Sequence, residues 1–185
     1  MGGELVASMA ACAALERVIC VARADSAWWR TADPIISVVL DRFGRLDIPV
    51  NNAGVFISKP FTDYTTVSGV NLAGFFWLTQ RAIAEMVSRY GGHVVNVSAT
   101  IAEVASSGRL LVLAALTKAA AATRSLAVGY ASRGILVNAV ASGVIQTTVH
   151  PANSYQRLGG RLPSLGRAGP MSDVLDGVLL LESSR

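Results

Sequence analysis

The sequence lacks an apolar run long enough to cross a membrane. A membrane-spanning helix needs about 20 consecutive apolar residues, whereas the run from Leu110 to Leu116 ends at Thr117 and Lys118. The N-terminal segment carries Glu4 and no basic stretch before its first apolar residues, which argues against a secretory signal peptide. We therefore expect a cytoplasmic protein with no membrane partner.

Clusters of cysteine, histidine or basic residues are also missing. Cys12 and Cys20 have apolar neighbours, and His93 and His150 stand alone, so we expect neither a disulfide nor a metal site. The formal net charge is +4, but the basic residues are spread along the chain without a basic run. Nucleic-acid surfaces need basic residues gathered on one face, so we expect no nucleic-acid partner.

What the sequence does contain is a high proportion of hydrophobic residues, 52% of 185. This length and composition suit one domain, residues 1–185, with a sizeable core. The expected strands are Arg17–Arg23, Leu46–Val50, His93–Ser98 and Ile135–Ala141, and the expected helices are residues 4–15, 35–43, 70–90, 110–132 and 173–181. Buried strands alternating with helices predict an α/β fold, a Rossmann-like parallel sheet flanked by helices.

Two helix starts are predicted from local chemistry. Pro34 is suited to the first position of a helix, so residues 24–34 are expected to be irregular and the helix to begin at Ile35. Ser172 is a suitable N-cap for the last helix, which is expected to begin at Asp173.

Small and polar residues follow three of the expected strands. Asn51-Asn52-Ala53-Gly54 follows the second strand, Ser98-Ala99-Thr100 ends the third, and Ser142 to Thr147 follows the fourth. In open parallel sheets, ligands bind beyond the carboxyl ends of the strands. The sequence therefore predicts a binding site at this edge of the sheet.

These segments resemble the short-chain dehydrogenase/reductase family. Asn51–Gly54 matches the family's motif after a strand, and Val70–Gly74 resembles the start of its next long helix. Arg133–Val140 is similar to its sixth strand, and Gly143–Thr147 is similar to its nicotinamide loop. The resemblance spans roughly residues 41–182. It implies an NAD(P)-dependent oxidoreductase that acts on an alcohol or carbonyl substrate.

The resemblance implies that several residues bind the cofactor. Those expected to line it are Asn52, Ala53, Gly54 and Gly143, with Thr147 on the carboxamide of nicotinamide, Lys118 on the ribose hydroxyls and Arg23 on the 2′-phosphate of NADP. The position of Arg23 favours NADP over NAD, whereas Asp25 favours NAD. Simpler interpretations are that Lys118 reaches water from a helix face and that Thr147 stabilises its own turn.

The resemblance also implies catalytic roles. Asn71 would hold a water in the proton relay, or else bond only to local backbone. Lys118 would lower the pKa of a catalytic tyrosine four residues before it, but Ala114 stands there. The helper serine falls near Ala99, so Ser98 or Thr100 would supply the hydroxyl. General acid catalysis contributes a factor of about 10²–10⁴, so we expect turnover to be impaired.

The sequence also departs from the family at its ends. It begins Met1-Gly2-Gly3-Glu4, without the family's first strand and complete glycine-rich phosphate loop, and it ends before the final strand. An alternative is that Arg17–Arg23 takes the vacant slot, followed by Val21–Ser26 without a glycine. Either placement predicts an incomplete sheet and an incomplete phosphate site.

Three functions follow from these observations. The first is an oxidoreductase with impaired turnover. The second is a non-catalytic domain that dimerises or binds a partner, because the expected helix 110–132 is apolar on nearly all sides and must be covered. In the family this helix and the one from Val70 pack against a second subunit, so a homodimer is implied. The third is a vestigial, truncated member of the family.

Overall fold

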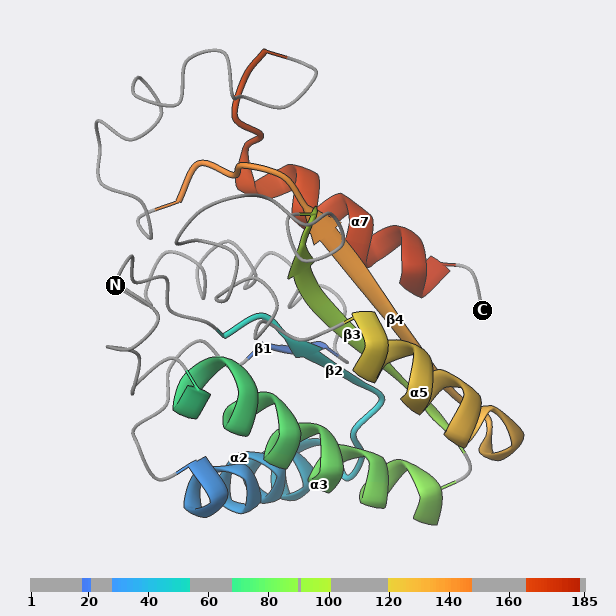
Figure 1. Cartoon of the computed structure of the whole chain (residues 1–185). Coiled ribbons are helices and arrows are strands. Elements are labelled where there is room, and N and C mark those ends of the chain that lie inside the picture. The colour runs from blue at the N-terminus through green and yellow to red at the C-terminus, as the bar shows by residue number, and fades with distance from the viewer. Residues whose placement is uncertain are drawn as a thin grey trace.

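The computed structural model describes residues 18–20, 28–53, 68–89, 91–100, 120–147 and 166–183. Four parallel strands form one sheet in the order β1-β2-β3-β4 (Figure 1). The strands are β1 (Val18–Cys20), β2 (Ile48–Asn51), β3 (Gly92–Ala99) and β4 (Ile135–Ser142). The helical segments are α2 (Trp28–Phe43), η3 (Ser68–Gly74), α3 (Phe75–Ser88), α5 (Ala120–Tyr130), η5 (Ala131–Arg133) and α7 (Met171–Ser183). The predicted α/β fold, a parallel sheet flanked by helices, is confirmed.

The sheet is covered by helices on both faces, and alternate residues of β3 belong to different layers. Val94 packs in a cluster that includes Ile36 of α2 and Ile83 of α3. Val95 packs on the other face in a cluster that includes Val178 of α7. This follows from the alternation of side chains along a strand, and it leaves α7 on the face opposite α2 and α3 (Figure 1).

Strand β1 lies beside β2, where the second of the two predicted placements puts it. Val18 is opposite Ile48 and Cys20 is opposite Val50 in a parallel pair. Residues 18–20 of the predicted segment Arg17–Arg23 therefore take the slot next to β2, the strand that leads into Asn52 and Ala53. The expected helix 4–15 and the residues after β1 that would face a phosphate, 21–26, lie outside the described residues.

Two predicted helix starts were wrong. Helix α2 begins at Trp28 and contains Pro34, because Ala32, Ile36 and Val39 form one buried stripe that continues across the proline. The packing of this stripe outweighs the missing backbone hydrogen bond. Helix α7 begins at Met171, so Ser172 lies inside it and not at the expected N-cap position.

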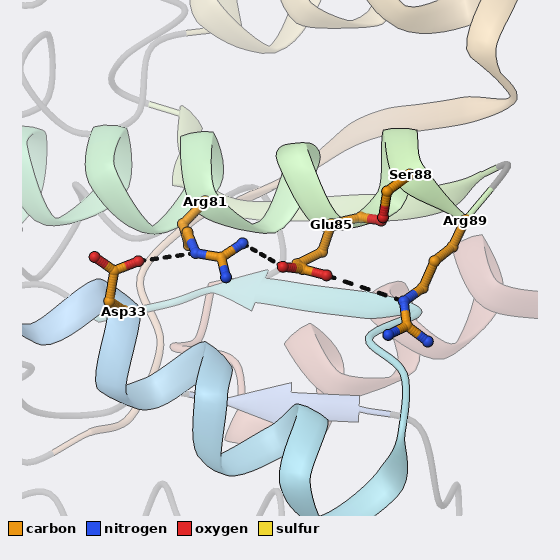
Figure 2. A network of polar contacts seen from close by, with 5 residues as sticks. All are labelled: Asp33, Arg81, Glu85, Ser88 and Arg89. Carbon is orange, nitrogen blue, oxygen red and sulfur yellow. Dashed lines mark hydrogen bonds and ion pairs between the residues drawn. The ribbon is translucent and has the colours of Figure 1, made fainter.

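A network of ion pairs joins α2 to α3 on the outer surface (Figure 2). Arg81 Nε lies 2.8 Å from Asp33 Oδ1, and Arg81 Nη1 lies 2.5 Å from Glu85 Oε1. Arg89 Nε is 3.9 Å from Glu85 Oε2. The pKa of Arg81 is raised, chiefly by its hydrogen bond to Glu85. Because Asp33 is largely exposed, its ion pair with Arg81 contributes little to stability.

A buried histidine links the sheet to α7. His93 is fully buried in β3, with its Nε2 2.9 Å from Asn138 Nδ2 and its Nδ1 3.0 Å from Glu182 Oε1. Within the described ranges, no group of histidine, cysteine, aspartate and glutamate could hold a metal ion. No helix in the described part of the chain has the length and hydropathy needed to cross a membrane.

Candidate functional site

The carboxyl ends of β2, β3 and β4 meet at one edge of the sheet because the strands are parallel. Asn51 is opposite Asn96, and Ala99 is opposite Ser142. Ser142 Oγ donates a 3.2 Å hydrogen bond to the carbonyl oxygen of Ser98. The three small and polar segments predicted from the sequence therefore begin side by side at this edge.

The end of β2 carries the first expected cofactor residues. Asn52 and Ala53 follow the strand and are half-buried. The backbone N–H of Asn52 donates to the carbonyl oxygen of Val50 at 3.1 Å, which fixes the turn out of the strand. Gly54 lies outside the described residues. The small side chain of Ala53 allows a ligand to approach the backbone here.

The end of β3 separates the two candidate hydroxyl groups. Ser98 is buried at 6% exposure, whereas Thr100 is exposed. Ser98 shares the strand face of Asn96 by the alternation of side chains. Its Oγ has no hydrogen-bond partner among the described residues. Buried hydroxyls are normally hydrogen-bonded, so Ser98 retains the capacity to bind a group that enters from this edge.

Asn71 is buried at 1% exposure in η3, a π-helical segment that precedes α3. Such segments are frequent at functional sites, since the wider turn interrupts the regular helix. The position agrees with the expected start of the long helix, which continues as Phe75–Ser88. The two predicted interpretations, a water in a proton relay or a local backbone contact, both fit a buried amide.

The loop after β4 is held against the segment that precedes α7. Gln146 N donates to Gly169 O at 2.8 Å, and Gly169 N donates to Val144 O at 2.8 Å. A Cβ on Gly169 would lie only 2.9 Å from Ile145 Cδ1, so glycine permits this close approach. The loop therefore has a defined position, in which Gly143 is exposed and Thr147 is half-buried.

Three expected site residues, Arg23, Gly54 and Lys118, lie outside the described residues, as does Ala114. Helix α5 begins at Ala120, so the described part of the expected helix 110–132 starts just after Lys118. The roles assigned to these positions remain predictions from the sequence.

A set of buried polar residues next to this edge was not predicted from the sequence. They are Asn51, Thr79, Asn96 and Thr123, joined by three hydrogen bonds of 2.8 to 2.9 Å. One signal was available in the sequence: Asn96 interrupts the apolar run Val94-Val95-Asn96-Val97. An amide inside a buried strand must find partners, so it could have been flagged as part of a polar cluster.

A family model described as short chain dehydrogenase matches residues 2–157. The 3-oxoacyl-[acyl-carrier-protein] reductase FabG of Thermotoga maritima is 32% identical over 157 residues, which cover 80% of this chain and 63% of that protein. The FabG of Aquifex aeolicus is 34% identical over 144 residues, covering 74% of this chain and 58% of that protein. The chain therefore spans less than two thirds of the length of these relatives.

Two solved structures are similar in fold. The structure described as ElxO with NADP bound has a TM-score of 0.72 and 26% identity, and the match covers 85% of this chain and 68% of that one. A short-chain type dehydrogenase/reductase from Mycobacterium marinum has a TM-score of 0.73 at 23% identity, covering 86% and 66% of the two chains. The second likeness concerns the fold alone.

Proposed function

Because the chain belongs to the short-chain dehydrogenase family, we propose that it binds NADP(H) and catalyses the slow interconversion of an alcohol and a carbonyl group. The observation that carries this proposal is the edge where β2, β3 and β4 end. The buried Oγ of Ser98, which has no partner among the described residues, lies there beside the loop after β4. Ligands bind beyond this edge in open parallel sheets.

The residues at this edge fit a dinucleotide. Ala53 and Gly143 leave room for the cofactor to approach the backbone, with Asn52 and Gly54 beside Ala53. Thr147 would hold the carboxamide of nicotinamide, and Lys118 would hold the ribose hydroxyls. Preference for NADP is supported by the ElxO structure, which is described with NADP bound, and by Arg23 as the partner for a 2′-phosphate.

The bound cofactor would supply the hydride, and residues of this chain would bind the reacting oxygen and deliver the proton to it. In reduction, hydride transfer to the carbonyl carbon leaves an alkoxide that must be protonated. The Ser98 hydroxyl would donate a hydrogen bond to that oxygen, with Thr100 as the more exposed alternative. Asn71 would hold the water that delivers the proton, because Ala114 cannot donate one. This makes the chain an atypical member with slow turnover.

Calorimetric titration of the folded protein with NADPH and NADH tests the binding half of the proposal. We expect NADPH to bind more tightly than NADH, and Lys118→Ala to weaken NADPH binding by about tenfold or more, the cost of a hydrogen bond to a charged group. Lys59→Ala is the matched control, since it removes the other lysine of the chain. If the folded protein binds neither nucleotide, the proposed oxidoreductase function is wrong.

Restoring the tyrosine tests the catalytic half. We expect Ala114→Tyr to raise the rate of NADPH oxidation by about 10²–10⁴, the usual contribution of a positioned general acid. A 3-oxoacyl thioester is the first substrate to use, because FabG relatives are named for that substrate class. Ala115→Tyr serves as the control for adding a phenol one residue away. Equal rates in the two variants would contradict the assigned position.

A second candidate function is self-association without turnover, and one observation favours it. Leu72, Phe76 and Trp77 on η3 and α3 are exposed, as is Val128 on α5. Contiguous exposed apolar side chains mark interaction sites, and the rings of Phe76 and Trp77 are in contact. The resemblance implies a homo-oligomer through these helices. A vestigial chain, the third interpretation, predicts neither nucleotide binding nor defined association.

A further inference from the structure

Four buried polar side chains form a hydrogen-bonded series from α3 through the sheet to α5. Asn51 Nδ2 donates to Thr79 Oγ1 at 2.9 Å and to Asn96 Oδ1 at 2.8 Å. Asn96 Nδ2 donates to Thr123 Oγ1 at 2.9 Å. All four residues are between 0% and 7% exposed. The series thus joins four elements through the interior of the molecule.

The donors and acceptors of this series couple the orientations of its two amides. The Asn51 amide nitrogen carries two hydrogens and gives one to Thr79 and one to Asn96. Asn96 accepts at its oxygen and donates with its nitrogen to Thr123. Turning the Asn96 amide over would place two NH₂ groups against each other. The amides of Asn51 and Asn96 therefore keep matching orientations, and neither can turn over alone.

Two members of the series adjoin the ends of the central strands. Asn51 ends β2 and directly precedes Asn52, the first of the expected cofactor residues. Asn96 lies in β3 and shares a strand face with Ser98. A shift of either amide would move the turn after β2 or the Ser98 hydroxyl.

The other two members lie on the flanking helices. Thr123 is near the start of α5, shortly after Lys118 in the sequence. Thr79 lies on α3, which continues the segment that contains Asn71. Apolar contacts are non-directional, whereas hydrogen bonds have a fixed length and angle. The series can therefore set the position of each helix along the strands, which apolar packing alone leaves adjustable.

We propose that Thr79, Asn51, Asn96 and Thr123 are positioning residues for the nucleotide site, with Thr123 holding α5 against β3 through the hydrogen bond from Asn96. This inference rests on the proposed function, because it assigns the series to that same site. The four side chains act through their neighbours and not by contact with substrate. In the low-dielectric interior, loss of one member leaves another polar group buried without its partner.

Thr123→Val tests the proposal, since valine has nearly the same shape but cannot accept the bond from Asn96. We expect the Kd for NADPH to rise by about tenfold to a hundredfold, the effect of misplaced binding groups. We also expect faster hydrogen exchange at the Asn52 amide, which is bonded to Val50 O at 3.1 Å. Thr123→Ser keeps the hydroxyl and should retain both properties. Ser125→Ala removes an exposed hydroxyl from the same helix and should change neither.

An unchanged Kd together with unchanged Asn52 exchange in folded Thr123→Val overturns the proposal. Should that variant fail to fold, Thr79→Val breaks the series at its other end, and unchanged affinity there overturns it equally. A wild-type protein that does not bind NADPH rejects the proposed function. In that case exchange at the Asn52 amide still reports whether α5 is coupled to the end of β2.

Discussion

Ser98 carries a buried hydroxyl at the end of β3 whose oxygen has no partner among the described residues. A buried polar group left unsatisfied costs about 1–3 kcal/mol. Local violations of this kind are expected at functional sites, where a bound group supplies the missing partner. Stability and function should therefore respond in opposite directions when this hydroxyl is removed.

We expect Ser98→Ala to leave the free energy of unfolding unchanged or to raise it by about 1 kcal/mol, because no hydrogen bond within the described fold is lost. NADPH oxidation should fall by about tenfold, the effect of losing one hydrogen bond to the reacting oxygen. Urea unfolding and the rate assay measure the two effects separately.

Ser142→Ala is the matched control for that prediction. Its hydroxyl donates to the carbonyl oxygen of Ser98, so its removal should lower the free energy of unfolding by about 1 kcal/mol. If Ser98→Ala destabilises the protein as much as Ser142→Ala does, the Ser98 hydroxyl has a structural partner and its assignment to the site is wrong.

The same strand shows how far single residues could be predicted. The sequence placed Ser98 and Thr100 on either side of Ala99 but could not choose between them. Side chains alternate across a strand, so positions two apart lie on the same face and alternation does not distinguish these two hydroxyls. Which of them is buried depends on how the rest of the fold covers the end of β3, which is a tertiary property. The structure buries Ser98 and exposes Thr100. Burial distinguishes the two hydroxyls, while their catalytic roles remain predictions.

At the scale of elements, the turn between α3 and β3 depends on a glycine. Gly91 has φ +132°, a backbone conformation rarely adopted by other residues. A Cβ at this position would lie 2.8 Å from the carbonyl oxygen of Gly134, which begins the approach to β4. Gly92 N also donates to Gly134 O at 3.3 Å. The turn thus brings the starts of β3 and β4 together.

We expect Gly91→Ala to lower the free energy of unfolding by about 1–3 kcal/mol, the cost of a strained backbone conformation. Gly129→Ala is the control, since Gly129 lies in α5 with open space around its Cβ position. That change should stabilise the protein by up to about 1 kcal/mol through helix propensity. Thermal or urea unfolding of both variants checks the pair, and equal stability of Gly91→Ala and wild type would contradict the argument.

Helix boundaries were the least predictable elements. Pro34 is a sound start signal in isolation, yet α2 begins at Trp28 because a buried stripe through Ala32 and Ile36 continues across the proline. The strands were more predictable, since their continuous apolar runs reflect burial on both faces. The strand expected at Leu46–Val50, for example, was observed at Ile48–Asn51.

For the whole molecule, the alternation of strands and helices was enough to predict the parallel sheet, while a site at its carboxyl edge stays a prediction. The slot of β1 was not predictable, because an apolar run such as Val18–Cys20 does not encode which strand it pairs with. Its pairing with β2 is a long-range property of the fold. The buried amide series was missed for the same reason, since Asn51 and Asn96 meet only after the strands pair.

Exposed apolar side chains on α3 lead to a prediction about assembly. Phe76 is 51% exposed and Trp77 39% exposed, with their rings in edge contact at 5.0 Å between centroids. Aromatic residues are enriched at the centres of interfaces, so we expect a homodimer by light scattering coupled to gel filtration. Phe76→Glu should convert it to a monomer, because a charge would be buried in the interface. Val38→Glu, which replaces a more exposed apolar residue on α2, should remain dimeric. A strictly monomeric wild-type protein at micromolar concentration would exclude this surface as a self-association site.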